Sequence, residues 1–260
     1  MTGLNLSFDY HADSAGKDPD SSSARLKADH QLLWTKELPD GSPFELHVPE
    51  TAKERRSNYL MLDQSDGKSF TVGSDAITNS YTTWTKLKPL FEGLSDAQRT
   101  RYLDPPYTIG SAMIWPLRTI HLPAMNTARG FGPSGTLIAD RMDLTLECIR
   151  RHYAKEPGGH REESPLSPLD DVITNYADFF ELFDGFRGFV DFFHFQDLVL
   201  PGYDGVRFLL PFNDFARSSL PTTVDEYVTY REATLDFIER RGARMADWVE
   251  TNHPDIEVVR

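Results

Sequence analysis

YADFFELFDGFRGFVDFFHF, residues 176–195, is the stretch of sequence that decides the fold of this chain. Its phenylalanines recur at every third position from Phe180 to Phe195, with further aromatic residues beside them. Side chains spaced three residues apart on a helix shift gradually round its axis, so these rings would cover a broad surface rather than a narrow stripe. A platform for stacking bases would need interleaved basic residues, and the stretch has only Arg187. We therefore expect these rings to form a core or an obligate interface.

The sequence around this stretch is mainly helical. Ser167 before Pro168, followed by acidic residues, predicts a helix that runs to about Phe183. A second helix is expected at 138–153 from its apolar periodicity, and turn residues at 201–205 predict a hairpin between 197–200 and 206–210. A capping box, Thr223-x-x-Glu226, predicts a long helix with one apolar face. That face consists of Val224, Tyr227, Val228, Leu235, Ile238, Met245 and Val249.

Short extended segments, separated by turn signals, make up the first half of the chain. We expect strands at 32–36, 44–48, 59–62 and 69–72, a helix or two near 74–90, and a buried strand at 109–115 that Pro116 closes. Residues 11–24 have little apolar surface to bury, which predicts a mobile arm or a surface loop over residues 1–24. Residues 25–260 are then expected to form a single α+β domain, in which a short-stranded N-terminal half packs against a mainly helical C-terminal half.

Composition narrows the classes of function. The 40 acidic and 27 basic residues give a formal charge of -13, which disfavours broad contact with nucleic acid or anionic lipid. The first 20 residues lack the apolar run of a signal peptide, and no apolar run approaches the roughly 20 residues that span a bilayer. The single cysteine, Cys148, excludes an intramolecular disulfide and a cysteine-based zinc cage. We expect a cytoplasmic protein with no membrane partner, which binds nucleic acid only if it has a local basic site.

A glycine-rich loop suggests an anion site. Arg129-Gly130-Phe131-Gly132-Pro133-Ser134-Gly135 leads into the helix expected at 138–153. Unpaired N–H groups and the positive end of the helix dipole would meet there, which favours phosphate or carboxylate. We therefore predict a ligand site formed by Asn126, Arg129 and Gly130. The three loop glycines match the dinucleotide fingerprint literally, but the strand and the acidic residue that it requires are missing, so a plain flexible loop is the simpler interpretation.

Charged residues on the following helix admit two interpretations. Arg141 lies on the flank of the apolar face, where a guanidinium needs a carboxylate, backbone carbonyls or a ligand anion; a salt bridge within the fold is favoured over a ligand. Asp143 and Glu147 are spaced so that they could hold a cation, but arginines share their face, so we expect a charge network and no metal. If the protein is an enzyme, Asp143 or Glu147 could act as acid or base.

Arg187 and His194 fit loosely the Arg-x4-6-His signature of helical ribonucleases of the HEPN class. Seven positions along a helix return almost to the same side, so both side chains could face one site where His194 acts as acid or base. The spacing is common by chance and the surroundings are intensely apolar. Arg187 is also a candidate ligand-binding residue on its own.

Seven segments of the chain form a specific set: Gly16–Ser21, Leu32–Trp34, Tyr107–Gly110, Ala128–Phe131, Ile138–Arg151, Phe186–Phe193 and Leu210–Phe215. Together they resemble an uncharacterised family of bacterial proteins, a domain of unknown function, over most of the chain. The resemblance implies no activity and no cofactor. It implies that Arg129-Gly130-Phe131 belongs to the family pattern while Gly132 and Gly135 do not, and that the family has an aliphatic residue in place of His194.

Three hypotheses of function remain open. The first is the binding of, or enzymatic action on, a phosphate-bearing or carboxylate-bearing small molecule such as a nucleotide, at the Arg129 loop with Arg141. The second is an interaction module whose acidic surface and aromatic face bind a basic protein or a second copy of the chain. The third is a nuclease or toxin of a bacterial defence system.

Overall fold

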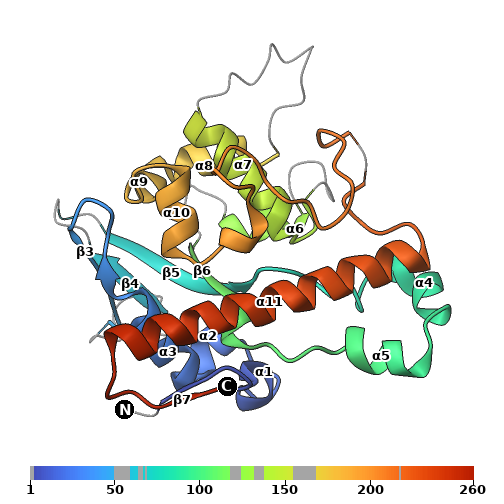
Figure 1. Ribbon diagram of the computed structural model, residues 1–260, viewed down its shortest axis with the longest axis horizontal. Helices are drawn as coiled ribbons and strands as arrows, with labels where there is room; N and C mark the ends of the chain where they lie inside the picture. Colours follow the sequence, from blue (N-terminus) through green and yellow to red (C-terminus); the bar gives the residue numbers. More distant parts are fainter. Residues whose placement is uncertain are drawn as a thin grey trace.

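An antiparallel sheet in the first half and helices in the second give the α+β fold that the sequence predicts (Figure 1). The computed structural model describes residues 3–49, 59–63, 67, 69–117, 124–131, 138–154, 168–216 and 218–260. Our predictions about Gly132, Gly135 and Ser167 lie outside these residues. The division into an arm and a single domain stays a prediction.

The sheet has five strands in sequential order, and every pair is antiparallel. The strands expected at 44–48, 59–62 and 69–72 are confirmed, and the buried strand expected at 109–115 starts at residue 112, after a 3-10 turn, η2 (Ile109–Ser111). The five strands are β2 (Lys36–Glu37), β3 (Pro43–His47), β4 (Leu60–Asp63), β5 (Ser69–Ala76) and β6 (Ala112–Pro116).

The N-terminal segment is helical rather than extended. It forms α1 (Tyr10–Asp13), α2 (Pro19–Ser22) and α3 (Ala24–Trp34). The strand expected at 32–36 is therefore wrong: Ser23 caps α3 through a 3.0 Å bond from the backbone N–H of Leu26, and the helix continues through Trp34. Residues 11–24, for which we predicted a mobile arm or loop, hold two of these helices, and the side chain of Asp20 bonds to β5.

Between the sheet strands β5 and β6 lie η1 (Thr85–Leu87), α4 (Lys88–Glu92) and α5 (Asp96–Tyr102). The helices expected near 74–90 begin later than predicted because β5 extends to Ala76. They pack beside one end of the long C-terminal helix (Figure 1).

The second half contains short helices. They are α6 (Met125–Phe131), α7 (Met142–Ala154), α8 (Asp170–Asn175), α9 (Ala177–Glu181), α10 (Phe186–Phe192) and η3 (Gln196–Leu198). The helix expected from residue 138 starts at Met142, because Ala139 and Asp140 have positive φ angles of 48° and 56°. The helix expected to reach Phe183 is broken at Tyr176 and ends at residue 181, and the hairpin is reduced to one bridge between Val199 and Val206.

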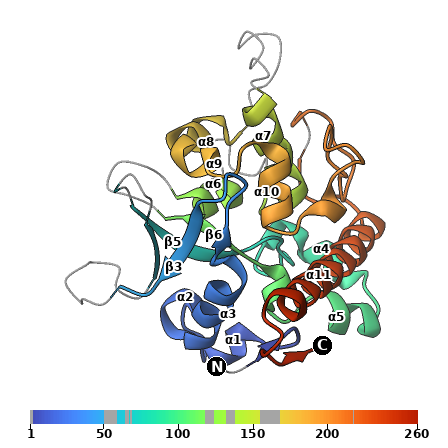
Figure 2. The same ribbon diagram turned by 60° about the vertical axis from the view of Figure 1, so that its left-hand side comes forward.

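A 29-residue helix, α11 (Val224–Asn252), confirms the long helix with its Thr223 cap. It runs between α6–α10 on one side and α1–α3 on the other (Figures 1 and 2). At Gly110 the chain approaches α11 so closely that a Cβ would lie 2.5 Å from the carbonyl oxygen of Ile238, so only glycine fits. Beyond α11, β7 (Val258–Val259) pairs in parallel with β1 (Leu4–Asn5), which places the two ends of the chain side by side.

The phenylalanine run is a core that joins the two halves. Phe189 is fully buried, and its ring lies 5.1–5.8 Å from those of Phe180, Phe183 and Phe193. Rings of the first half pack onto this cluster: Trp34 on Phe193 at 5.2 Å, Phe44 on Phe192 at 5.0 Å, Phe70 on Phe179 at 5.7 Å and Trp115 on Phe189 at 6.2 Å. Of the two interpretations, core and obligate interface, the structure shows the core.

Candidate functional site

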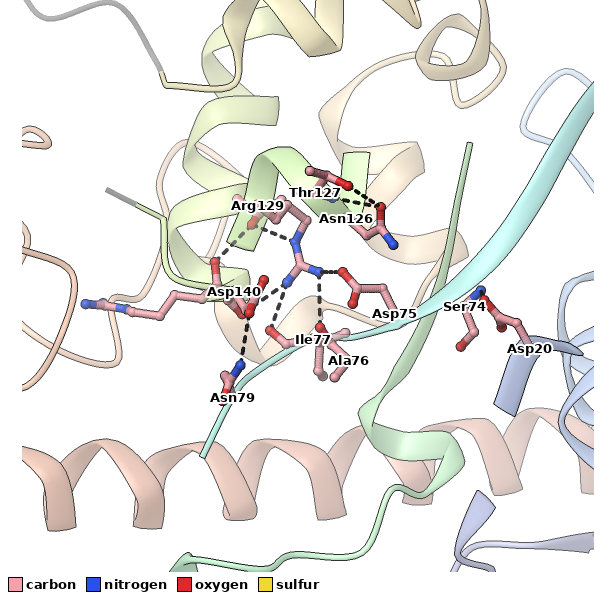
Figure 3. A network of polar contacts seen from close by, with 12 residues as sticks. Asp20, Ser74, Asp75, Ala76, Ile77, Asn79, Asn126, Thr127, Arg129 and Asp140 are labelled. Atoms are coloured by element: carbon pink, nitrogen blue, oxygen red, sulfur yellow. Dashed lines mark hydrogen bonds and ion pairs between the residues drawn. The ribbon is translucent and has the colours of Figure 1, made fainter. Parts of the chain in front are cut away.

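Arg129, the centre of the predicted anion site, is bound within the fold (Figure 3). Its guanidinium pairs with Asp75 and donates to Thr145 Oγ1 at 3.1 Å. It also donates 3.1 Å hydrogen bonds to the carbonyl oxygens of Ala76, Ile77 and Asp140. A guanidinium has five N–H donors, and these five contacts use them all. The side chain is fully buried, and it ties α6 to strand β5 and to the turn before α7.

The other two residues predicted at this loop make local contacts within the fold. Asn126 is half-buried, and its side-chain oxygen accepts 2.7 Å and 3.4 Å bonds from the adjacent Thr127 (Figure 3). Gly130 is buried, and a Cβ there would lie 3.1 Å from the carboxylate of Asp140. The glycine is therefore explained by close packing.

Arg141 forms the salt bridge within the fold that we favoured over a ligand. It pairs through two nitrogens with the carboxylate of Asp143, which also accepts a 2.8 Å bond from the backbone N–H of Leu209. Its remaining contacts are the carbonyl oxygens of Ser219 and Leu210, at 3.1 and 3.3 Å. Both partners of the salt bridge are buried.

Glu147 is held by two arginines of its own helix, with 2.9 Å and 2.7 Å contacts to Arg150 and Arg151. With Asp143 in the Arg141 salt bridge, both acidic candidates for catalysis are paired with guanidinium groups. Among the described residues, no group of three His, Cys, Asp or Glu side chains is placed to hold a metal ion.

A different cluster of basic groups lies at the C-terminal end of α10. Lys36, in β2, donates a 2.7 Å hydrogen bond from Nζ to the carbonyl oxygen of Phe192. Arg241, in α11, donates a 3.0 Å bond to the next carbonyl, that of Phe193, and two 2.8 Å bonds to Gly110 and Ala112. Both cations therefore satisfy carbonyl groups that a helix end leaves unpaired, where the helix dipole is negative.

His194 completes this cationic cluster, which we define as Lys36, His194 and Arg241. It has a φ of +58° and occupies the left-handed position of a Schellman motif, in which the N–H of Phe195 bonds to the carbonyl of Val190 at 2.9 Å. Glycine usually takes this position, because a side chain is strained there. The imidazole is 7% exposed, and its Nε2 has no hydrogen-bond partner among the described residues.

Burial disfavours the charged forms of all three groups of the cationic cluster, and neighbouring cations add to this effect at Lys36 and His194. Burial, together with Arg241, lowers the pKa of Lys36 to about 7. Burial, with Lys36 and the arginines nearby, lowers the pKa of His194 to about 3, and burial lowers that of Arg241 to about 9. Among the described residues, no carboxylate forms an ion pair with Lys36 or Arg241, and Nη2 of Arg241 has no partner. Within the described part of the chain, the positive charge of this cluster therefore has no carboxylate counter-ion.

Lys36 also lines a cavity of about 420 Å³ between β2 and α10, which we call the α10 cavity. Arg187 lines it too, with a side chain that is 76% exposed and whose Nε lies 3.5 Å from Asp191. A Cβ at Gly188, another lining residue, would lie 1.8 Å from the carbonyl oxygen of Phe183, so the wall requires glycine. Of the two residues in the ribonuclease hypothesis, Arg187 thus lines the cavity, whereas His194 is buried and is not one of the lining residues.

Sequence reasoning missed Lys36, Arg231 and Arg241. Two arginines interrupt the apolar face of α11: Arg231 follows Tyr227 by four residues, and Arg241 follows Ile238 by three. This interruption is the feature of the sequence that could have identified these two residues. Arg231 is 1% exposed, and its one hydrogen bond, from Nη1 to the carbonyl of Asn79, is 3.3 Å long. In the part of the chain that the structure describes, its Nε and Nη2 have no hydrogen-bond partner.

The sequence pattern of a family of unknown function, DUF6994, matches residues 4–245. No curated protein and no solved structure matches the chain. In the part of the chain that the structure describes, no helix has the length and apolar character needed to cross a membrane.

Proposed function

We propose, for a chain that belongs to this family of unknown function, that it binds a small molecule carrying a carboxylate or phosphate group in the α10 cavity. A volume of about 420 Å³ lies in the range of small-molecule sites. Arg187 and Lys36 are the two cations on its wall. This proposal keeps the class of ligand predicted from the sequence and moves it away from Arg129, whose donors are all taken within the fold.

One observation carries the proposal: among the residues that the structure describes, the cationic cluster has no carboxylate partner. Buried charges in proteins are normally paired, because an unpaired charge loses its hydration without compensation. The lowered pKa values of Lys36 and Arg241 express that cost. An anion bound in the cavity would supply counter-charge to this cluster and would bind more tightly for that reason.

The acidic residues on the cavity wall limit the charge of the ligand. Glu37, Asp184 and Asp191 accompany the two cations. Asp191 is already engaged, since it accepts bonds from Gln196 and from the Tyr203 hydroxyl. The remaining two carboxylates would repel a polyphosphate, so the balance favours a ligand with a single anionic group.

The other hypotheses have less support. Among the described residues the exposed large apolar side chains are Val48, Leu200 and Val259, which gives an interaction module little apolar surface to use. The buried His194, with its lowered pKa, is poorly placed for acid or base chemistry in a nuclease. A cytoplasmic location remains part of the proposal, on the basis of the single, buried Cys148.

A thermal-shift screen with monocarboxylates, sugar phosphates and nucleotides tests the proposal. A ligand at a hundred times its Kd should add about 2.7 kcal/mol to the stability of the wild-type protein. Arg187→Gln should weaken that gain. Arg240→Gln is the matched control, because Arg240 is also exposed and also pairs with an aspartate four residues away. If no anion stabilises the protein, or if both variants respond like the wild type, this function is ruled out.

A further inference from the structure

We infer that the Lys36 amine is a nucleophile that forms an imine with a carbonyl compound in the α10 cavity, and that the ligand is an oxo acid or a related carbonyl compound with one anionic group. The inference rests on the proposed function, since it names the ligand class of the same site. It adds a covalent step and assigns that step to one atom, Nζ of Lys36.

The position of Lys36 is the first argument. Its Nζ donates a 2.7 Å bond to the carbonyl oxygen of Phe192, and both residues line the cavity. Aromatic rings surround the amine, with centroids 4.3 Å away at Phe192, 5.1 Å at Trp34 and 5.0 Å at Trp248. These rings exclude water from one side of the amine, and a fixed, partly desolvated amine is what addition to a carbonyl requires.

The charge state of Lys36 is the second argument. Only a neutral amine has a lone pair for attack, and an ordinary lysine, with a pKa of about 10.4, is neutral in about one molecule in 2,500 at pH 7. Burial and the neighbouring Arg241 lower the pKa of Lys36 to about 7, so about half of the molecules carry the neutral amine at that pH. The described part of the chain offers this amine no carboxylate that would hold it protonated.

A purely structural role for Lys36 is the competing explanation. A cation at the C-terminus of α10 interacts favourably with the helix dipole and with the ring faces. A structural cap, however, needs only a positive charge and a donor, and arginine provides both. The two roles therefore differ in what Lys36→Arg does: it keeps the cap and removes the nucleophile.

The chemistry balances without an oxidant or a metal. The lone pair of Nζ attacks the carbonyl carbon and forms a C–N bond, while the C=O π electrons move to the oxygen. One proton then passes from the nitrogen through solvent to this oxygen, which gives a neutral carbinolamine. The hydroxyl group takes a second proton from solvent and leaves as water as the nitrogen lone pair forms C=N, and the nitrogen returns its remaining proton to solvent. Arg187, on the same wall, faces the anionic group of the ligand.

Borohydride trapping tests the inference. The protein is incubated with pyruvate, with glyoxylate or with propionaldehyde, an uncharged probe, then reduced with sodium borohydride and analysed by intact-mass and peptide mass spectrometry. Hydride addition turns the imine into a stable secondary amine. We expect one adduct per chain, located at Lys36, with a rate of capture that rises with pH to a midpoint near 7.

Three variants separate the explanations. Lys36→Arg and Lys36→Met should lose the adduct, whereas Lys86→Arg, a change at an exposed lysine, should keep it. Arg187→Gln should slow the capture of pyruvate at least tenfold and leave propionaldehyde unaffected. Circular dichroism of Lys36→Arg verifies that the variant is folded. Adducts spread over exposed lysines, or an undiminished adduct in Lys36→Arg, would overturn the inference.

Lactate distinguishes failure of the imine inference from failure of the proposed anion binding. It has the carboxylate of pyruvate but no ketone, so it reports anion binding alone. A lactate shift that depends on Arg187, without a pyruvate adduct at Lys36, would overturn the imine and leave the anion site standing. Absence of both a shift and an adduct would overturn the two together.

Discussion

The indole Nε1 of Trp34 donates a 3.0 Å hydrogen bond to Nδ1 of His30. Because an indole nitrogen is only a donor, Nδ1 must be the acceptor, and the proton of the neutral imidazole is on Nε2. Nε2 lies 3.0 Å from Ser74 Oγ, so the imidazole donates to the hydroxyl and has no lone pair with which to remove its proton. This Ser–His pair is therefore a structural contact and not a nucleophile with its base.

Acid should destabilise the protein through its buried histidines. Burial lowers the pKa of His30 and that of His194 to about 3. Between about pH 6.5 and pH 3 the unfolded chain binds protons that the native state does not, so the free energy of unfolding falls as the pH falls. His30→Gln should flatten this slope in urea denaturation series at pH 7, 6, 5 and 4. The same change at the exposed His11 should leave the slope as it is; equal slopes in all three proteins would contradict the prediction.

The carboxyl group of Asp20 should make the protein less stable as the pH rises, which is opposite to the effect of the buried histidines. Its carboxylate accepts 2.7 and 2.8 Å bonds from the backbone N–H of Ser74, yet burial raises its pKa to about 7 (Figure 3). The native state then binds the proton more tightly than the unfolded chain, and its contribution to stability is lost as the pH rises from about 4 to about 7. Asp20→Asn, which keeps an acceptor oxygen, should gain stability relative to wild type at pH 8 and much less at pH 5. Asp255→Asn, at an exposed site, is the control, and a gain that does not depend on pH would refute the assignment.

Arg129 and Arg231 are both buried arginines, but replacing them should have opposite effects. Arg129→Met leaves Asp75 and three carbonyl oxygens without their donor, and we expect a loss of about 3 kcal/mol or more. Arg231→Met removes a guanidinium with one long hydrogen bond, so the protein should become more stable by about 1 kcal/mol. Denaturant titration at pH 7 compares the two. A destabilised Arg231→Met would mean that this arginine has a partner in solution.

Substitutions at the centre of the phenylalanine core should reduce the stability of the protein most. Phe189→Ala removes the ring that touches the other rings of the cluster, and it should cost about 3–5 kcal/mol. Phe189→Leu should cost clearly less, because more of the volume is kept. Val48→Ala, at a side chain that is 43% exposed, should change stability by less than about 0.5 kcal/mol. Thermal unfolding monitored by near-ultraviolet circular dichroism would report all three.

Local patterns predicted the parts of the fold that depend on local chemistry. Alternating apolar residues between turn signals gave β3 to β5, and the periodic face after Thr223 gave α11. Helix α3 was missed because Leu32, Leu33 and Trp34 look like a strand once the capping role of Ser23 is overlooked. The helix expected to reach Phe183 is interrupted at Tyr176 and ends at Glu181, and residues 169–183 contain no glycine or proline that would indicate the interruption.

The candidate site was less predictable, because its contacts join distant parts of the chain. Lys36 and Phe192 are 156 residues apart along the chain. Nothing in the sequence near Lys36 indicates that the end of a helix will lie next to it. Arg187 could be named because an isolated arginine in an aromatic stretch is conspicuous. Arg129 was predicted to bind an anion because its loop was expected to have unpaired N–H groups. The guanidinium instead donates to carbonyl groups at the end of β5, just after it and in the turn before α7.

The bond from Lys36 to Phe192 also protects an edge of the sheet. Strand β2 is two residues long and, among the described residues, pairs with β3 alone, so without the tether it would fray and leave the longer strand β3 as the free edge of the sheet. The lysine tether anchors it to the aromatic core. A substitution of Lys36 that removes this bond would therefore expose an aggregation-prone edge before the protein unfolds. Aggregation of a Lys36 variant that is otherwise folded would be the first observable effect.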